Sequence, residues 1–129
     1  MPRKETLLND AVFDQLRRAM EADAAGFTTL YRDFLCDAWE SLQQLRESVR
    51  SKEAEDIRAK AHYLKSSCLV LGAHEAAQYA GRLEQAAIAS DRSQYASTLD
   101  QLKLALEKVQ TELAERLGPS VLPANQPAA

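Results

Sequence analysis

Apolar positions along the chain recur at steps of three and four, the spacing of one helix face rather than the alternation of a strand. The apolar stripe of a first, short helix consists of Leu8, Val12, Leu16 and Met20. Asn9 or Asp10 is suited to cap its start, and Gly26 then interrupts the pattern. The stripe of a second helix consists of Phe27, Tyr31, Phe34, Ala38, Leu42, Leu45 and Val49. We expect this helix to end near residues 50–52.

The second half of the chain predicts three further helices. Their apolar stripes are Ile57, Ala61, Leu64, Cys68 and Leu71; Ala76, Ala80, Leu83 and Ala87; and Tyr95, Leu99, Leu102, Leu106, Val109, Leu113 and Leu117. Gly72 suits the end of the first of these helices, Ser90 and Asp91 break the chain after the second, and Gly118 with Pro119 ends the last. The middle stripe is unusually small, with Gly81 beside it, and small residues let two helix axes approach closely.

Four long amphipathic helices joined by short breaks predict an all-α fold, an antiparallel up-and-down four-helix bundle with the short N-terminal helix capping one end. Residues 1–7 are expected to be a lead-in, 8–117 the bundle, and 118–129, which lack periodicity, a disordered tail. With 129 residues and only four Gly and four Pro, the composition agrees with one helical domain that can bury a core without disulfides or metals.

Charge and hydropathy exclude several classes of function. Sixteen Lys and Arg against 19 Asp and Glu give a net charge of −3, which argues against a nucleic-acid binder that neutralises phosphates. No segment approaches the roughly 20 apolar residues of a membrane span, and no signal-peptide pattern follows the start. We therefore expect a cytoplasmic protein, and the length of 129 residues favours a monomer. Cys36 and Cys68 form no CxxC pair, and we interpret them as small apolar residues rather than a redox pair.

The chain has two histidines, and only His62 faces away from a predicted core. At about 100° per residue, His62 lies about 145° around the axis from the centre of its helix's apolar stripe. The residues on its face and the adjoining flank are Arg58, Lys65, Ser66, Leu69, Tyr63 and Val70. A neutral imidazole nitrogen is a nucleophile near pH 7, and a lysine one turn on can stabilise an attached phosphoryl group. From periodicity alone, an ordinary histidine on a solvated face is the alternative.

The exposed apolar residues beside His62 are the kind of surface that a docking partner buries. His74 has a different setting, at the start of the following helix. The helix dipole disfavours a cation there, so we expect His74 to be neutral and structural.

Residues 61–73, AHYLKSSCLVLGA, resemble the signature of histidine-containing phosphotransfer domains. That signature has a histidine, a hydrophobic residue and a lysine at the third and fourth positions, a small pair, and a Leu-Gly-Ala end to the helix. The resemblance is strong in this motif and extends as a pattern over roughly residues 8–117. It implies a four-helix bundle with the histidine exposed midway along one helix.

Carried over residue by residue, the resemblance implies that His62 is phosphorylated and that Lys65 steadies the phosphoryl group. The family's next helix usually supplies a Gln or Glu near the histidine, and Glu84 is the matching position, 22 residues on. It would accept a hydrogen bond from one ring nitrogen and leave the other free, the alternative being a solvated helix residue. Ser66 departs from the pattern, since the family usually has glycine there.

The resemblance implies a phosphorelay carrier that accepts a phosphoryl group from a receiver-domain aspartate and passes it to another. Receiver domains, and a hybrid histidine kinase as a further candidate, are the implied partners, with magnesium bound by the receiver and no cofactor on this chain. The alternative is a receiver-binding adaptor that no longer transfers phosphate. A kinase is disfavoured because Gly-rich nucleotide loops are absent. A di-iron bundle is disfavoured because Ala59 and Leu71 stand three residues before the histidines.

Overall fold

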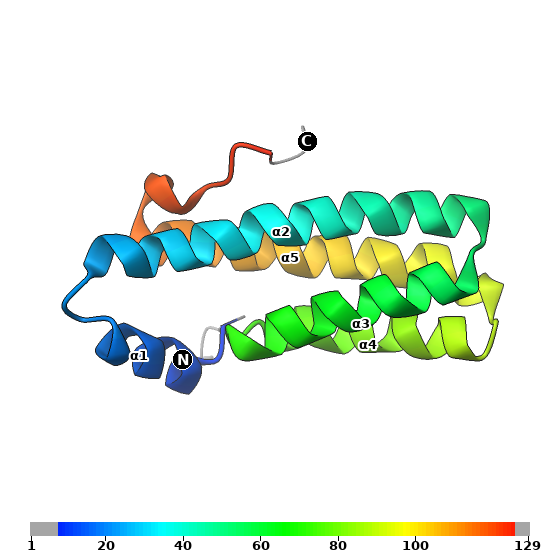
Figure 1. Ribbon diagram of the computed structural model, residues 1–129, viewed down its shortest axis with the longest axis horizontal. Helices are drawn as coiled ribbons and strands as arrows, with labels where there is room; N and C mark the ends of the chain where they lie inside the picture. Colours follow the sequence, from blue (N-terminus) through cyan, green and yellow to red (C-terminus); the bar gives the residue numbers. More distant parts are fainter. Residues whose placement is uncertain (1–7, 126–129) are drawn as a thin grey trace, which may run out of the picture.

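The computed structural model describes residues 8–125, which form a bundle of long helices with one short helix at its end (Figure 1). The α-helices are α1 (Asp10–Ala19), α2 (Ala24–Ser51), α3 (Ala54–Val70), α4 (His74–Ile88) and α5 (Tyr95–Leu117), with short 3₁₀ helices η1 (Arg92–Gln94) and η2 (Pro119–Val121). Helix α2 packs against α3 and α5, and α4 packs against the same two helices. The predicted all-α four-helix bundle with a short N-terminal helix is confirmed.

Side-chain caps and left-handed residues set the helix ends. Asn9 accepts a hydrogen bond from the Val12 amide at the start of α1, as expected. Asp23 caps α2 by accepting from the Gly26 amide at 2.9 Å, so Gly26 lies in the first turn of the helix. The expectation that Gly26 interrupts the helical pattern was therefore wrong. A Cβ at this position would clash with the Asp23 carboxylate, which explains a glycine directly after the cap.

Helix α1 covers the end of the bundle where α3 turns into α4 (Figure 1). The Asn9 amide donates to the carbonyl of Gly72, which has φ +86° and ends α3 as predicted. The buried anchor of α1 is Phe13, whose ring makes an edge contact with Phe27 at a centroid distance of 5.2 Å. The stripe expected for α1 passed through Val12, which is only half-buried, and omitted Phe13, although Phe13 lies three residues before Leu16 and seven before Met20 on one helix face.

The most extensive helix contact in the described chain joins α3 to α4. The small stripe of α4 is buried, so the two helices approach closely, as the sequence predicts. On the opposite side of the bundle, the Trp39 indole of α2 donates to the Gln110 side chain of α5 at 2.6 Å. Both residues are buried, and this polar pair fixes the register of α2 against α5.

Over residues 118–125, the structure corrects the expectation that residues 118–129 form a disordered tail. Helix η2 packs against α2 and α5, and Val121 is fully buried. Further on, the Asn125 amide donates to the Cys36 carbonyl of α2 at 2.9 Å, and Figure 1 shows this red segment running beside α2. Residues 1–7 and 126–129, the predicted lead-in and the end of the predicted tail, lie outside the described residues.

The two cysteines are free thiols, as expected from their spacing. Cys68 is buried, and burial raises the pKa of its thiol to about 12, which keeps it protonated. Cys36 is half-buried on α2. None of the helices within residues 8–125 has the length and hydropathy needed to span a bilayer.

Candidate functional site

His62 lies near the middle of α3 on the face turned away from the core. The buried residues of this helix are Ile57, Ala61, Leu64 and Cys68, the stripe that the sequence predicts. The His62 side chain is 57% exposed, so the predicted outward orientation is confirmed. The imidazole thus lies on the solvent-facing side of α3, where a macromolecular partner can reach it.

Glu84 of α4 reaches across to this histidine. Its Oε2 atom lies 2.6 Å from Nδ1 of His62, and its Oε1 atom accepts a hydrogen bond from Nζ of Lys65 at 2.7 Å. Glu84 is only 6% exposed, so the alternative interpretation of this residue as a solvated helix position was wrong. One buried carboxylate thus holds two side chains of α3, each with a different oxygen.

The Lys65 hydrogen bond is the main reason why the pKa of Glu84 lies below its ordinary value. The hydrogen bond from His62 acts in the same direction, while burial opposes both. The carboxylate is therefore ionised at neutral pH and can only accept. In the neutral imidazole, Nδ1 must then carry the proton, which leaves the lone pair on Nε2.

Arg58 makes a local ion pair that sequence reasoning missed. Its guanidinium donates to both carboxylate oxygens of Glu55, three residues earlier on α3, at 2.5–3.2 Å. This pairing raises the pKa of Arg58 and lowers that of Glu55. The i, i+3 spacing is the signal that would have predicted it. The two cations expected around His62, Arg58 and Lys65, are thus each paired with a carboxylate.

Ser66, the departure from the family pattern, lies one turn beyond His62. Its hydroxyl donates to the His62 backbone carbonyl at 3.1 Å, so it is bonded along its own helix. The serine adds only its Cβ and Oγ to the surface that a partner must approach.

Two grooves flank this face of α3. One, of about 520 Å³ between α2 and α3, is lined by Leu30, Asp33, Phe34, Asp37, Tyr63, Ser66, Ser67, Val70 and Leu71. The Tyr63 hydroxyl donates to the Asp37 carboxylate across it at 2.7 Å, and Val70 is 69% exposed. The apolar flank predicted from Tyr63, Leu69 and Val70 is exposed, but sequence reasoning missed the contribution of α2, which only the tertiary fold brings alongside.

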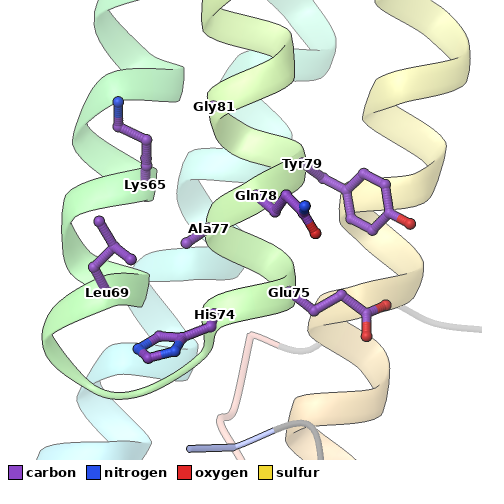
Figure 2. Close-up of a pocket in the computed structure, with 8 residues that line it drawn as sticks. All are labelled: Lys65, Leu69, His74, Glu75, Ala77, Gln78, Tyr79 and Gly81. Atoms are coloured by element: carbon purple, nitrogen blue, oxygen red, sulfur yellow. The ribbon is translucent and has the colours of Figure 1, made fainter.

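The second groove lies between α3 and α4, and Figure 2 shows Lys65 and Leu69 along one side with Gly81 and Ala77 on the other. His74, the first residue of α4, lies at the far end of this groove from Lys65 (Figure 2). Within residues 8–125, no group of three or more His, Cys, Asp and Glu side chains is placed to hold a metal ion.

Comparison with known proteins places the chain in a family. The model of the Hpt domain matches residues 29–112, which include α3, α4 and the His62 motif, and the chain belongs to the Hpt domain family. The fold is similar to the crystal structure of histidine-containing phosphotransfer protein B (HptB) from Pseudomonas aeruginosa PAO1, with a TM-score of 0.82. That match has 23% sequence identity and covers 88% of this chain and 96% of the other. A comparison with curated proteins found no match.

Proposed function

We propose that the protein is a phosphoryl carrier in which His62 accepts a phosphoryl group from a receiver-domain aspartate and passes it to a second receiver. The observation that carries this proposal is the 2.6 Å pairing of His62 Nδ1 with the buried Glu84 carboxylate. It orients the ring and leaves Nε2 as the nucleophile on an exposed side chain.

The proposed transfer balances without a further reactant. Nε2 attacks the phosphorus of the aspartyl phosphate, an N–P bond forms, and the P–O bond to the aspartate breaks to release its carboxylate. The ring keeps its proton on Nδ1 and acquires a positive charge, which the ionised Glu84 beside it stabilises. Reversal on a second receiver restores the neutral ring.

Lys65 has the second role in this proposal. Its Nζ is held by Glu84 in the unphosphorylated protein, and its side chain is 31% exposed. An ammonium group one turn from His62 can interact with phosphoryl oxygens when they arrive. Magnesium and most of the remaining transition-state stabilisation would come from the receiver, as in aspartyl-phosphate chemistry generally. The chain would act as a carrier without kinase activity of its own.

The apolar residues around His62 give the proposal its docking surface. Tyr63, Leu69 and Val70 are between 48% and 69% exposed and lie on α3 within about two turns of the histidine. A receiver that buries them brings its aspartyl phosphate over the imidazole.

The direct test is to mix the protein with phosphorylated receivers and to look for an acid-labile, alkali-stable label on this chain. We expect the wild type to be labelled and His62→Gln to remain unlabelled. His74→Gln is the matched control, and we expect it to be labelled like the wild type. Equal labelling of His62→Gln would contradict the proposal, whereas receiver binding without label in the wild type would support the adaptor function.

A further inference from the structure

Gly81 occupies an interior position of α4 where the backbone does not require glycine. The residues of the described chain with a positive φ are Lys52, Gly72, Ser90 and Gly118, so Gly81 has an ordinary helical φ. Glycine in a helix interior is less favourable than alanine because it loses more backbone entropy. Because α3 and α4 form the most extensive helix contact, this glycine indicates that an atom of α3 occupies the space that a side chain at position 81 would fill.

That contact is the side chain of Lys65. A Cβ built at position 81 would lie 3.3 Å from Cδ of Lys65, and no other heavy atom outside the immediate helix comes within 4 Å. This distance is shorter than ordinary contacts of a Cβ, so the lysine stem would have to move. In Figure 2 the Lys65 side chain extends along α3 to the level of Gly81 on the neighbouring α4.

The lysine stem carries an ammonium group that is bonded within the site. Nζ donates to Oε1 of Glu84 at 2.7 Å, and Glu84 lies one turn beyond Gly81 on the same helix. The other oxygen of this carboxylate is bonded to His62. We therefore expect a shift of a few tenths of an ångström in the stem to alter the hydrogen bonds of Glu84 and, through them, the imidazole.

We propose that Gly81 is a positioning residue for the His62 site, because its missing side chain forms the space on α4 that seats Lys65 against Glu84. The consequence for phosphoryl transfer rests on the function proposed above. The consequence for the geometry of Lys65, Glu84 and His62 does not, and it can be measured on the unphosphorylated protein.

The experiment compares Gly81→Ala in the wild type with the same change in a Lys65→Met background, where the stem remains but the ammonium group is lost. In the wild-type background we expect transfer from a phosphorylated receiver to slow by about 3- to 10-fold, a change of about 0.7–1.4 kcal/mol in the barrier. In the Lys65→Met background we expect Gly81→Ala to have no further effect. Gln85→Ala, an exposed change on the same helix, is the control and should transfer like the wild type.

Two further readouts separate this proposal from its alternatives. The urea midpoint of Gly81→Ala should equal or exceed that of the wild type, since alanine favours the helix, so a slower transfer is not a folding defect. The ¹⁵N resonances of the His62 ring should shift in Gly81→Ala and stay unchanged in Gln85→Ala. Unchanged ring resonances, or equal slowing in both backgrounds, would overturn the proposal. An unlabelled wild type with shifted resonances would instead overturn only the proposed function.

Discussion

Nδ1 of His62 on α3 and Oε2 of Glu84 on α4 lie 2.6 Å apart, and the second oxygen of the same carboxylate accepts from Lys65. A single buried group thus sets both the tautomer of the histidine and the position of the lysine. Substitutions of Glu84 can separate these two effects, because an amide keeps one acceptor and loses the charge.

Glu84→Ala is expected to slow phosphoryl transfer by about 10- to 100-fold. It removes a charge-assisted hydrogen bond worth about 1.5–3 kcal/mol, and each 1.4 kcal/mol is a factor of ten in rate. Glu84→Gln should retain the His62 hydrogen bond through its amide oxygen but release Lys65. Its transfer rate should therefore lie between those of the wild type and Glu84→Ala. Single-turnover transfer from a phosphorylated receiver measures the rates.

The ¹⁵N spectrum of the His62 ring checks the cause of this loss. Glu84→Gln should keep the Nδ1-protonated tautomer, and Glu84→Ala should show a mixture of both tautomers. Glu75→Gln, on the same helix but on the side turned away from Lys65 in Figure 2, is the control. Wild-type transfer by Glu84→Ala would show that the carboxylate has no part in the reaction.

The lowered pKa of Glu84 predicts a specific pH dependence of stability. A carboxylate whose pKa is lower in the folded than in the unfolded state stabilises the fold above its ordinary value of 4.5, and this contribution is lost as the pH falls through the folded-state pKa. The free energy of unfolding of the wild type should therefore fall relative to that of Glu84→Gln below about pH 4.5. Urea titrations of both proteins from pH 7 to pH 3 test this, and parallel curves would contradict it.

Ser66→Phe is expected to reduce receiver affinity by at least about tenfold. The position is exposed one turn from His62, so an aromatic ring there occupies the space above the imidazole that a partner must enter. Ser66→Gly should change affinity by less than about threefold, because the serine hydroxyl is bonded to its own helix. Calorimetry with a receiver domain measures both.

Lys108→Phe on α5 places the same ring at an exposed position of another helix and is the control for Ser66→Phe. An equal loss of affinity in both variants would indicate a nonspecific effect of the added ring. Unchanged affinity in Ser66→Phe would place the docking surface elsewhere.

Gln110→Leu is expected to lower the free energy of unfolding by about 1–3 kcal/mol, because it leaves the buried Trp39 N–H without its acceptor. Trp39→Phe in the same background removes that unpaired donor. Trp39→Phe should therefore lower the free energy of unfolding by less in the Gln110→Leu background than in the wild type. Urea unfolding of the four proteins gives the coupling, and strictly additive losses would show that the bond contributes nothing.

Val121→Ala is expected to lower the free energy of unfolding by about 1.5 kcal/mol, since each buried methylene-sized group contributes about 0.8 kcal/mol. Val121 is fully buried in η2, which packs on α2 and α5. Ser120→Ala, at the exposed neighbouring position, should change it by less than about 0.5 kcal/mol. Equal stability of both variants would show that η2 is not part of the folded unit.

Most of the bundle could be predicted because its helices carry long, uninterrupted stripes. All residues of the predicted α3 and α4 stripes are buried, and Gly72 marked the turn between the two helices. Phe13 and Val121 were missed for different reasons. Phe13 shares a helix face with Leu16 and Met20, but the predicted stripe passed through its neighbour Val12. Val121 belongs to a three-residue 3₁₀ helix, which is too short to show a repeat.

The members of the site and the pairing of Glu84 with His62 were predictable, whereas the pairing of Glu84 with Lys65 was not. The outward position of His62 follows from the helical wheel, and the matching position of Glu84 follows from the family motif. The sequence did not show that Lys65 and His62 would share one carboxylate, because this depends on the distance between α3 and α4. Gly81 was visible as a small residue, but its contact with Lys65 is a property of the packed pair.

The carboxylate of Glu84 has its two partners on a different helix, so the arrangement around His62 exists only while α3 and α4 are packed in register. In an unfolded chain His62 is an ordinary histidine with either ring nitrogen protonated and no fixed anion beside it. Competence for chemistry and correct assembly of the bundle are therefore one and the same property. Under the proposed function, a copy in which α3 and α4 are not packed together would neither accept nor keep a phosphoryl group on His62. Only the correctly folded fraction of the protein would then take part in phosphoryl transfer.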